Sequence, residues 1–428
     1  MPADEQQYWK SPSIYKVPPF ITDLKSKAYQ PQVVSFGPYH YRDDCLSSME
    51  EHKHRVLLHF LKRSKKTIEL FFESLSKKAR ELKDSYDKLD PTWNEGAGGQ
   101  FLKLMIMDGC FMLEIMRNTV GEKRDYAHND PIFNIQRLKY IAPYIGRDML
   151  LMENQLPMLV LYELVKVESD GKEDDVNELI RKFYFPHEKK KFTGTCLHVL
   201  DVFRKGLLMK PEHERKKVEL ESIEEMVNSA AKDNRQATDL NKTELIIRSA
   251  TELNEAGIRF KKSKTNSLED IFFAGGELEL PLITVDDTTE SKFLNAMTFE
   301  RLHSGAWNED AGNEVTSYVT FMDKIINDEQ DVALLHTRGI IQNDFGSDKA
   351  VAELFNSLCT EVTLPSNSSL EFVQRKICLH CELPWNRWRA NLNRTYFKNP
   401  WTILSLVAAI FLFVLTIIQA VFAVLSYH

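Results

Sequence analysis

The chain has 428 residues, of which 43% are hydrophobic, 11% aromatic and 27% charged. This composition is globular and excludes a disordered, collagen-like or low-complexity chain, while six cysteines are too few for a disulfide-dense scaffold. The formal charge is −7, and since residues 386–428 hold four basic and no acidic residues, the rest of the chain carries −11. Such an acidic globule is a poor partner for nucleic acid, because that affinity comes mainly from Lys and Arg.

Residues 1–45 are rich in proline and aromatic side chains, with the segments SPSIYKVPPF and YQPQVVSFGPYH. Proline forbids a long helix there, so we expect an extended arm packed on the domain, with a short strand over Gln32–Phe36. From residue 46 to 385 the pattern predicts one mainly helical unit, with two packed lobes as an option.

Apolar residues at helical spacing predict a helix over Ser47–Lys78. Two further segments, Gly98–Asn118 and Asp148–Val165, are apolar on nearly every face, which indicates central buried helices. Pro157 lies inside the second segment, so we expect a kink or a fresh helix at that point. Shorter helices are expected at 175–185, 195–208, 288–300, 315–327, 330–337 and 350–360. A last helix is expected over 370–388, interrupted near Pro384.

Residues 211–245 differ from their surroundings, since 15 of these 35 residues are charged and none is aromatic. We expect a solvated helix or a disordered, variable insertion there. Strand-forming residues follow it, in GIRFKK (257–262) and SLEDIFFAGGELELPLITV (267–285), which predict a small antiparallel sheet with a hairpin at Gly275 and Gly276.

The C-terminal segment from Pro400 to Leu425 contains no charged residue. A helix of this length reaches roughly 39 Å, more than the roughly 30 Å of a bilayer core, so we expect a transmembrane helix over 400–425. Trp401 would sit at the membrane interface, and the amide of Gln419 could bridge to a second copy of the chain, which would make a homo-oligomer.

Only three residues follow that segment, and no apolar signal peptide opens the chain. We therefore expect a single-pass, C-terminally anchored protein of the plasma membrane or an endomembrane, with lipid as a partner. Four basic residues in the juxtamembrane segment 386–399 place the large domain in the cytosol by the positive-inside tendency.

Several sequence blocks occur in an order that resembles the plant DUF247 family, also called UPF0481, over essentially the full chain. They include YQPQVVSFGPYHY, MIMDGCFMLEI, DMLLMENQLPMLVL and LELPLITVDDTTESKFLNAMTFE. The residues that carry the resemblance together are Ser35, Gly37, Pro38, Asp108, Gly109, Cys110, Phe111, Glu153, Asn154, Gln155 and Pro157.

The resemblance implies a land-plant protein with a C-terminal transmembrane helix and no established biochemical activity. Members at grass self-incompatibility loci are male determinants of pollen recognition, and relatives are linked to sex determination. Membership does not make this chain one of those determinants, so a pollen role is an alternative.

Carboxylates in apolar surroundings could have raised pKa values and perform acid–base catalysis. Asp108 and Glu114 lie in one apolar segment and Glu153 in another, so a cryptic enzyme is a second alternative. We favour a structural role, in which each carboxylate binds a backbone group or a basic side chain.

Cys378, His380 and Cys381 form C-x-H-C, but zinc requires four ligands and no second pair is evident. We predict no metal and no cofactor. The two cysteines are candidates for palmitoylation, although inert thiols are favoured.

The sequence contains no P-loop, dinucleotide glycine fingerprint, G-x-S-x-G or H-E-x-x-H. We therefore predict no catalytic residue. The prediction is a mainly α-helical domain with a small antiparallel sheet and one C-terminal transmembrane helix. Its function would be non-catalytic recognition or signalling through an unidentified protein partner, with 211–245 as the candidate partner-selecting surface.

Overall fold

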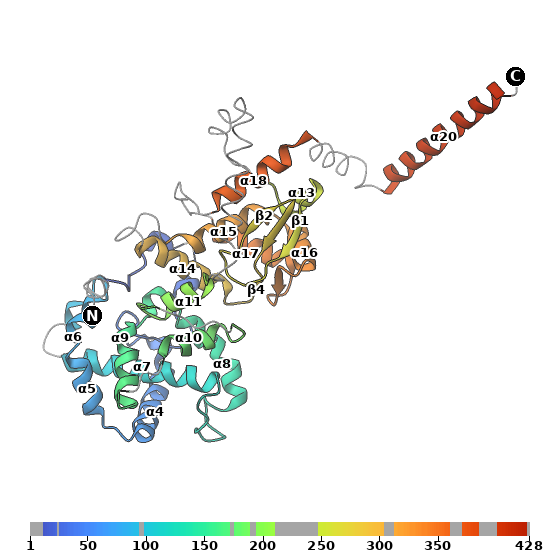
Figure 1. Cartoon of the computed structure of the whole chain (residues 1–428). Helices are drawn as coiled ribbons and strands as arrows, with labels where there is room; N and C mark the ends of the chain where they lie inside the picture. Colours follow the sequence, from blue (N-terminus) through green and yellow to red (C-terminus); the bar gives the residue numbers. More distant parts are fainter. Residues whose placement is uncertain are drawn as a thin grey trace.

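The computed structural model describes residues 12–23, 25–93, 98–171, 175–188, 194–209, 247–303, 312–359, 370–384 and 400–425. The candidate surface 211–245 and the basic segment 386–399 lie outside these residues. Figure 1 shows a helical lobe, made of α4 to α11, and a mixed lobe, which holds α13 to α18 and the strands. Buried apolar side chains of both lobes form one continuous cluster.

The helical lobe is arranged around α7 (Gly98–Thr119), which packs against helices on several sides. Nearly every side chain from Phe101 to Asn118 is buried, so the prediction of a central helix is confirmed. Its partners are α4 (Ser47–Ser64), α5 (Ile68–Ser76), α8 (Ile135–Asp148), α9 (Met158–Glu168) and α10 (Val176–Tyr184). The described part of the amino-terminal half has four further α-helices: α6 (Ala79–Asp84), α11 (Val199–Leu207) and the short α2 (Pro19–Thr22) and α3 (Ser26–Tyr29).

The helix expected over 47–78 is two helices. Lys65 follows α4 in the left-handed region, with φ of 55°, and the chain turns there before α5 begins at Ile68. The turn brings Phe71 and Leu75 into the core, where both are fully buried. Burial of these side chains stabilises the turn, since each contributes roughly 1.5–3 kcal/mol relative to an exposed side chain.

The second apolar segment is also divided. Helix α8 ends at Asp148, a 3₁₀ turn covers Met152–Asn154, and α9 starts at Met158 with Pro157 as its N-cap. Proline therefore begins a fresh helix, the second of the two expected outcomes, because its fixed φ suits a helix start and it has no N–H to leave unpaired.

The N-terminal arm, residues 12–40, contains two short helical turns but no strand over Gln32–Phe36. That expected strand is wrong. The backbone there is held by side chains of the helical lobe instead of a neighbouring strand, as described below.

The mixed lobe contains six helices and two small sheets in the part of the chain that is described. The helices are α13 (Ala250–Glu255), α14 (Thr289–His303), α15 (Glu314–Ile325), α16 (Glu329–Thr337), α17 (Asp348–Leu358) and α18 (Glu371–Glu382). The prediction of helices in this region is confirmed, with bounds shifted by a few residues. The last of them was expected to be interrupted near Pro384, and α18 ends just before that residue, at Glu382.

The expected hairpin is present between β2 (Phe272–Ala274) and β3 (Glu277–Leu280), which pair antiparallel. The sheet is nevertheless mixed, because β1 (Arg259–Lys262) pairs parallel with the other edge of β3. The chain reverses once between β1 and β2 and again at the hairpin, so β1 and β3 run in one direction. Strands β4 (Ile283–Val285) and β5 (Ile341–Asn343) form a separate parallel pair.

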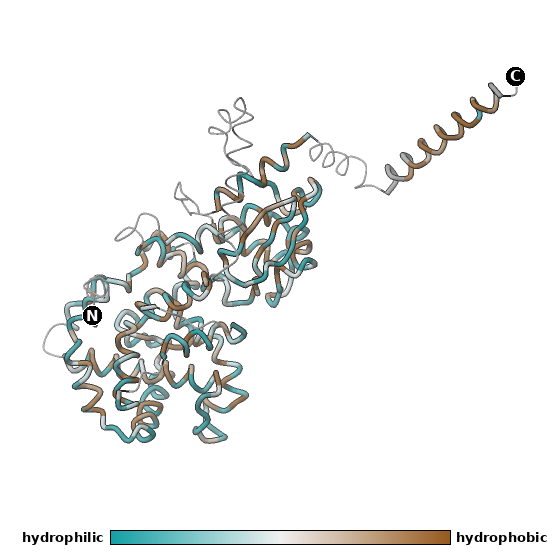
Figure 2. The backbone as a smooth tube through the Cα atoms, in the orientation of Figure 1, coloured by the Kyte–Doolittle hydropathy of each residue, from teal (hydrophilic) through white to brown (hydrophobic). Residues whose placement is uncertain are grey.

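Helix α20 (Pro400–Leu425) stands apart from the two lobes, and its apolar side chains are exposed (Figures 1 and 2). Among the described residues, however, no helix combines the length and the apolar character that crossing a bilayer requires. The expected transmembrane helix and single-pass anchor are therefore wrong.

Gly109 allows α7 to approach α9 closely. A Cβ at this position would lie 2.5 Å from Leu164 Cδ1 and 3.1 Å from Val160 Cγ1. We expect Gly109→Ala to lower the free energy of unfolding by about 1–3 kcal/mol through overpacking, measured by urea denaturation. Gly99→Ala in the same helix is the matched control, since its nearest atom would be 3.9 Å away. We expect it to be neutral or stabilising by up to about 1 kcal/mol. Equal effects of the two substitutions would contradict the close approach.

Candidate functional site

Asp148, at the end of α8, binds three consecutive backbone N–H groups of the N-terminal arm. Its carboxylate oxygens accept from Gln32 (3.0 and 3.1 Å), Val33 (2.7 Å) and Val34 (3.0 Å). Asp148 is fully buried, and the neighbouring Arg147 guanidinium lies 2.7 Å from it. One side chain thus replaces the strand partner that this stretch of arm would otherwise need.

Asn154 and Gln155 extend this arrangement. Asn154 Oδ1 accepts from Phe36 N at 2.6 Å, while Nδ2 donates to Val34 O (3.0 Å) and Asp148 O (2.9 Å). Gln155 Nε2 donates to two carbonyls of the turn before it, and Oε1 accepts from Leu200 N of α11 at 3.1 Å. Both side chains are fully buried. The chain between α8 and α9 runs through the core without forming an α-helix, so its backbone groups lack helical partners. The two side-chain amides bind these groups instead.

Asp108, in the middle of α7, binds the next part of the arm. Its Oδ2 accepts from Gly37 N at 2.8 Å, and Lys53 Nζ lies 2.8 Å from Oδ1. The same ammonium donates to Ser35 O at 2.6 Å and lies 2.6 Å from Glu50. Burial raises the pKa of Asp108 to about 6, and the neighbouring Lys53 limits that rise. The Asp108 carboxylate, the Lys53 ammonium and the arm therefore form one buried unit. Asp108, Lys53, Asp148, Asn154 and Gln155 are called here the arm-binding cluster.

Gly37 fits between the arm and the cluster. Its φ is +71°, and a Cβ there would lie 2.9 Å from Gln155 O and 3.1 Å from Tyr86 Oη. Phe36 packs against Phe111 of α7, with ring centroids 6.2 Å apart, and Cys110 is fully buried. Three of the blocks that carried the family resemblance, those of Gly37, Asp108 and Asn154, thus meet at one buried place. The sequence showed them only as separate blocks.

The carboxylates proposed for acid–base catalysis are not brought together. Glu114 binds both terminal nitrogens of Arg63 and accepts from Tyr126 Oη at 2.9 Å. Glu153 accepts from Val17 N of the arm at 2.7 Å, and burial raises its pKa. Asp108 forms an ion pair with Lys53. Each of the three carboxylates therefore binds a basic side chain or a backbone N–H group, the contacts that were expected for a structural role.

His198 fixes the start of the arm. This fully buried residue is the N-cap of α11, where Nδ1 accepts from Asp201 N at 3.2 Å, and its Nε2 lies 3.1 Å from Ser13 O. Both contacts are satisfied by the neutral tautomer with the proton on Nε2. Burial lowers the pKa of His198 to about 4.

The cysteine motif lies on α18. Cys381 is buried and Cys378 half-buried, and burial raises the pKa of both thiols, that of Cys381 to about 11. The His380 ring packs edge-on against Phe273, 5.4 Å between centroids. Palmitoylation of these cysteines stays a prediction. In α20, Gln419 is exposed, and the side chain of Trp401 lies outside the described residues.

A metal-like grouping that the sequence did not indicate consists of His59, Glu114 and Asp125, whose potential ligand atoms lie within 4.8 Å of one another. Arg63 binds both carboxylates, with Nη1 2.7 Å from Glu114 and 3.5 Å from Asp125. A guanidinium therefore already supplies the positive charge that these groups require.

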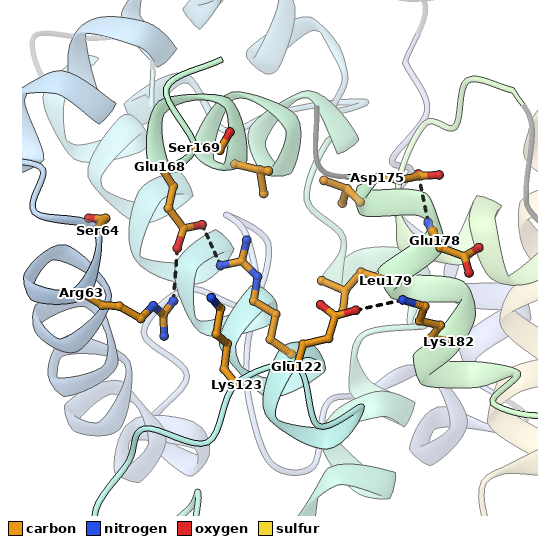
Figure 3. Close-up of a pocket in the computed structure, with 13 residues that line it drawn as sticks. Arg63, Ser64, Glu122, Lys123, Glu168, Ser169, Asp175, Glu178, Leu179 and Lys182 are labelled. Carbon is orange, nitrogen blue, oxygen red and sulfur yellow. Dashed lines mark hydrogen bonds and ion pairs between the residues drawn. The ribbon is translucent and has the colours of Figure 1, made fainter. Parts of the chain in front are cut away.

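A polar hollow of about 640 Å³ opens beside this grouping, where the ends of α4, α7, α9 and α10 meet (Figure 3). Glu168, at the end of α9, accepts from Arg63 at 3.3 Å and from Arg117 at 2.7 Å. Glu122 binds Lys182 at 3.0 Å. Sequence reasoning missed the hollow, because its residues come from four helix ends that are far apart in the chain.

Comparison with known proteins gives the following findings. The model of the family DUF247, described as "Plant protein of unknown function", matches residues 14–415. The chain is 32% identical to the UPF0481 protein At3g47200 of Arabidopsis thaliana, over 97% of this chain and 86% of that protein. It is 22% identical to a second Arabidopsis UPF0481 protein, At3g02645, over 95% and 89% of the two chains. No solved structure matches.

The arm-binding cluster is tested by Gly37→Ala, with Gly339→Ala as the matched control. Both glycines have φ near +70°, but the added Cβ has no atom within 4 Å at Gly339. We expect Gly339→Ala to cost about 1–2 kcal/mol of unfolding free energy from the backbone alone. Gly37→Ala should cost at least about 2 kcal/mol more, since the Gln155 carbonyl cannot move freely. Equal losses in urea denaturation would contradict tight packing of the arm.

The neutral state of His198 predicts a pH dependence. Its folded pKa lies below the unfolded value of about 6.5, so the unfolded chain binds more protons between pH 6.5 and 4. Stability should therefore fall as pH is lowered through this window, by up to about 3 kcal/mol from this residue. In His198→Asn, which can still cap α11, this part of the dependence should vanish while other groups titrate as before. Parallel curves of unfolding free energy against pH for the two proteins would refute the assignment.

Proposed function

Since this chain belongs to the DUF247 family of plant proteins, we propose that it is a non-catalytic recognition protein that presents a folded surface to a protein partner. The proposal is supported by the hydrogen bonds that the motif residues make. Asp108, Asn154, Gln155 and Glu153 direct their polar atoms at backbone groups of the arm and of the core. Residues placed in this way hold the arm and the core together, which supports a role in shaping the protein over a role in acting on a substrate.

The electrostatics of these groups are also those of a scaffold. A catalytic carboxylate has to reach the reacting atoms of a substrate. Asp108 has 1% exposure and Glu114 has none, and both contact a basic side chain. Removing one member of such a buried pair is strongly destabilising, which gives these residues a structural reason to be present.

Isosteric substitutions separate recognition from catalysis. We expect Glu153→Gln to fold and to capture the same proteins from plant tissue as the unchanged chain, because the amide oxygen can still accept from Val17 N. Capture is measured by cross-linking and mass spectrometry, per amount of folded protein. The same variant should restore function in plants that lack the chain.

Glu114→Gln and Asp108→Asn are tested beside it, with the thermal midpoint as the folding control. Loss of capture is expected only in proportion to loss of folded protein. A variant that folds and captures normally but does not restore function would favour the enzyme alternative and overturn the proposal.

A further inference from the structure

The polar hollow contains unused hydrogen-bond donors on one side. Arg117 is only 5% exposed, and its Nη1 donates to Glu168, but its Nε and Nη2 donate to no atom of the described chain. The Lys123 ammonium next to it also has no hydrogen bond or ion pair among the described residues. Arg63, by contrast, is already bound by Glu114, Asp125 and Glu168.

An acceptor lies on the opposite side. Asp175 is the N-cap of α10, where Oδ1 accepts from Glu178 N at 3.1 Å, and its second oxygen accepts from no atom of the described chain. Figure 3 shows Lys123 and Glu168 on one side of the hollow and Asp175 and Glu178 on the other. The hollow therefore has open donors on Arg117 and Lys123 at one side and an open acceptor on Asp175 at the other.

The charge balance restricts the ligand. Four basic and four acidic side chains line the hollow, so its formal charge is close to zero. A phosphate dianion would meet Glu168 and Glu122 beside the basic groups, and a purely apolar ligand would leave the free donors unpaired. A ligand that carries one charge of each sign satisfies both sides.

We propose that the hollow binds a segment of a partner protein that carries an acidic and a basic side chain close together. The acidic side chain binds Arg117 and Lys123, and the basic side chain binds Asp175. A partner segment of this kind follows from the recognition role proposed above and gives that role a chemical specificity. Charge-assisted hydrogen bonds at both ends fix the orientation of the segment.

The test uses the full chain and three fluorescein-labelled glycine–serine peptides, with one Glu, one Arg, or both three residues apart. Binding is measured by fluorescence anisotropy at low salt. We expect the mixed peptide to bind at least about tenfold more tightly than either single-charge peptide. Lys123→Gln and Asp175→Asn should each remove that advantage, and Asn still caps α10.

Lys77→Gln is the matched control, since this lysine is the C-cap of α5, is 70% exposed and does not line the hollow, so the substitution should leave binding unchanged. No saturable binding of the mixed peptide up to millimolar concentration, or equal binding of all three peptides, would overturn the inference. Partner capture that persists unchanged in Lys123→Gln and Asp175→Asn would overturn it as well, while leaving the recognition role intact. Absence of any captured partner would instead contradict the recognition role itself.

Discussion

The architecture depends on a small set of side chains that bind the backbone of the N-terminal arm. Three consecutive N–H groups, from Gln32 to Val34, have one carboxylate as their acceptor, and that carboxylate lies more than a hundred residues away in the chain. A buried N–H without an acceptor costs about 1–3 kcal/mol, so losing Asp148 would affect several groups at once. Burying the charged groups is tolerated because each has close partners, Arg147 for Asp148 and Lys53 for Asp108.

In the same cluster, residues that look chemically suggestive in the sequence bind the backbone of the arm. Carboxylates and amides within an apolar helix suggest a catalytic pocket, because raised pKa values are expected there. Burial does raise the pKa of Asp108 and Glu153, yet both accept hydrogen bonds from the arm. A raised pKa indicates that a carboxylate is buried, whereas its hydrogen-bond partners indicate which groups it holds in place.

Helices that are apolar on every face were predictable from the sequence, and α7 is the clearest case, since its pattern admits no exposed side. The sequence could not show that the strand expected over Gln32–Phe36 is absent. Val33, Val34 and Phe36 are typical strand residues, and Asp148, which binds the backbone N–H groups in place of a neighbouring strand, is distant in the chain. The turn at Lys65 also has no local signal, as neither glycine nor proline stands there. The contacts expected for the motif carboxylates, with backbone groups or basic side chains, are present. The hollow depends on the packing of four helix ends and could not be predicted from any one segment. The parallel pairing of β1 with β3 and of β4 with β5 likewise depends on tertiary contacts.

The arm also contacts the mixed lobe. Ser291 and Asn295 of α14 both donate to Ala28 O, at 2.6 and 3.0 Å, across sequence separations of 263 and 267 residues. At a synthesis rate of roughly 5–20 residues per second, Ala28 is made tens of seconds before Ser291 and Asn295, whose side chains donate to its carbonyl. The arm can therefore reach its final position in two steps: the stretch from Gln32 to Phe36 can bind Asp148 and Asn154 once the helical lobe has been made, whereas Ala28 has to wait for α14. Biogenesis of this protein should thus include an interval in which the arm is held by the helical lobe alone.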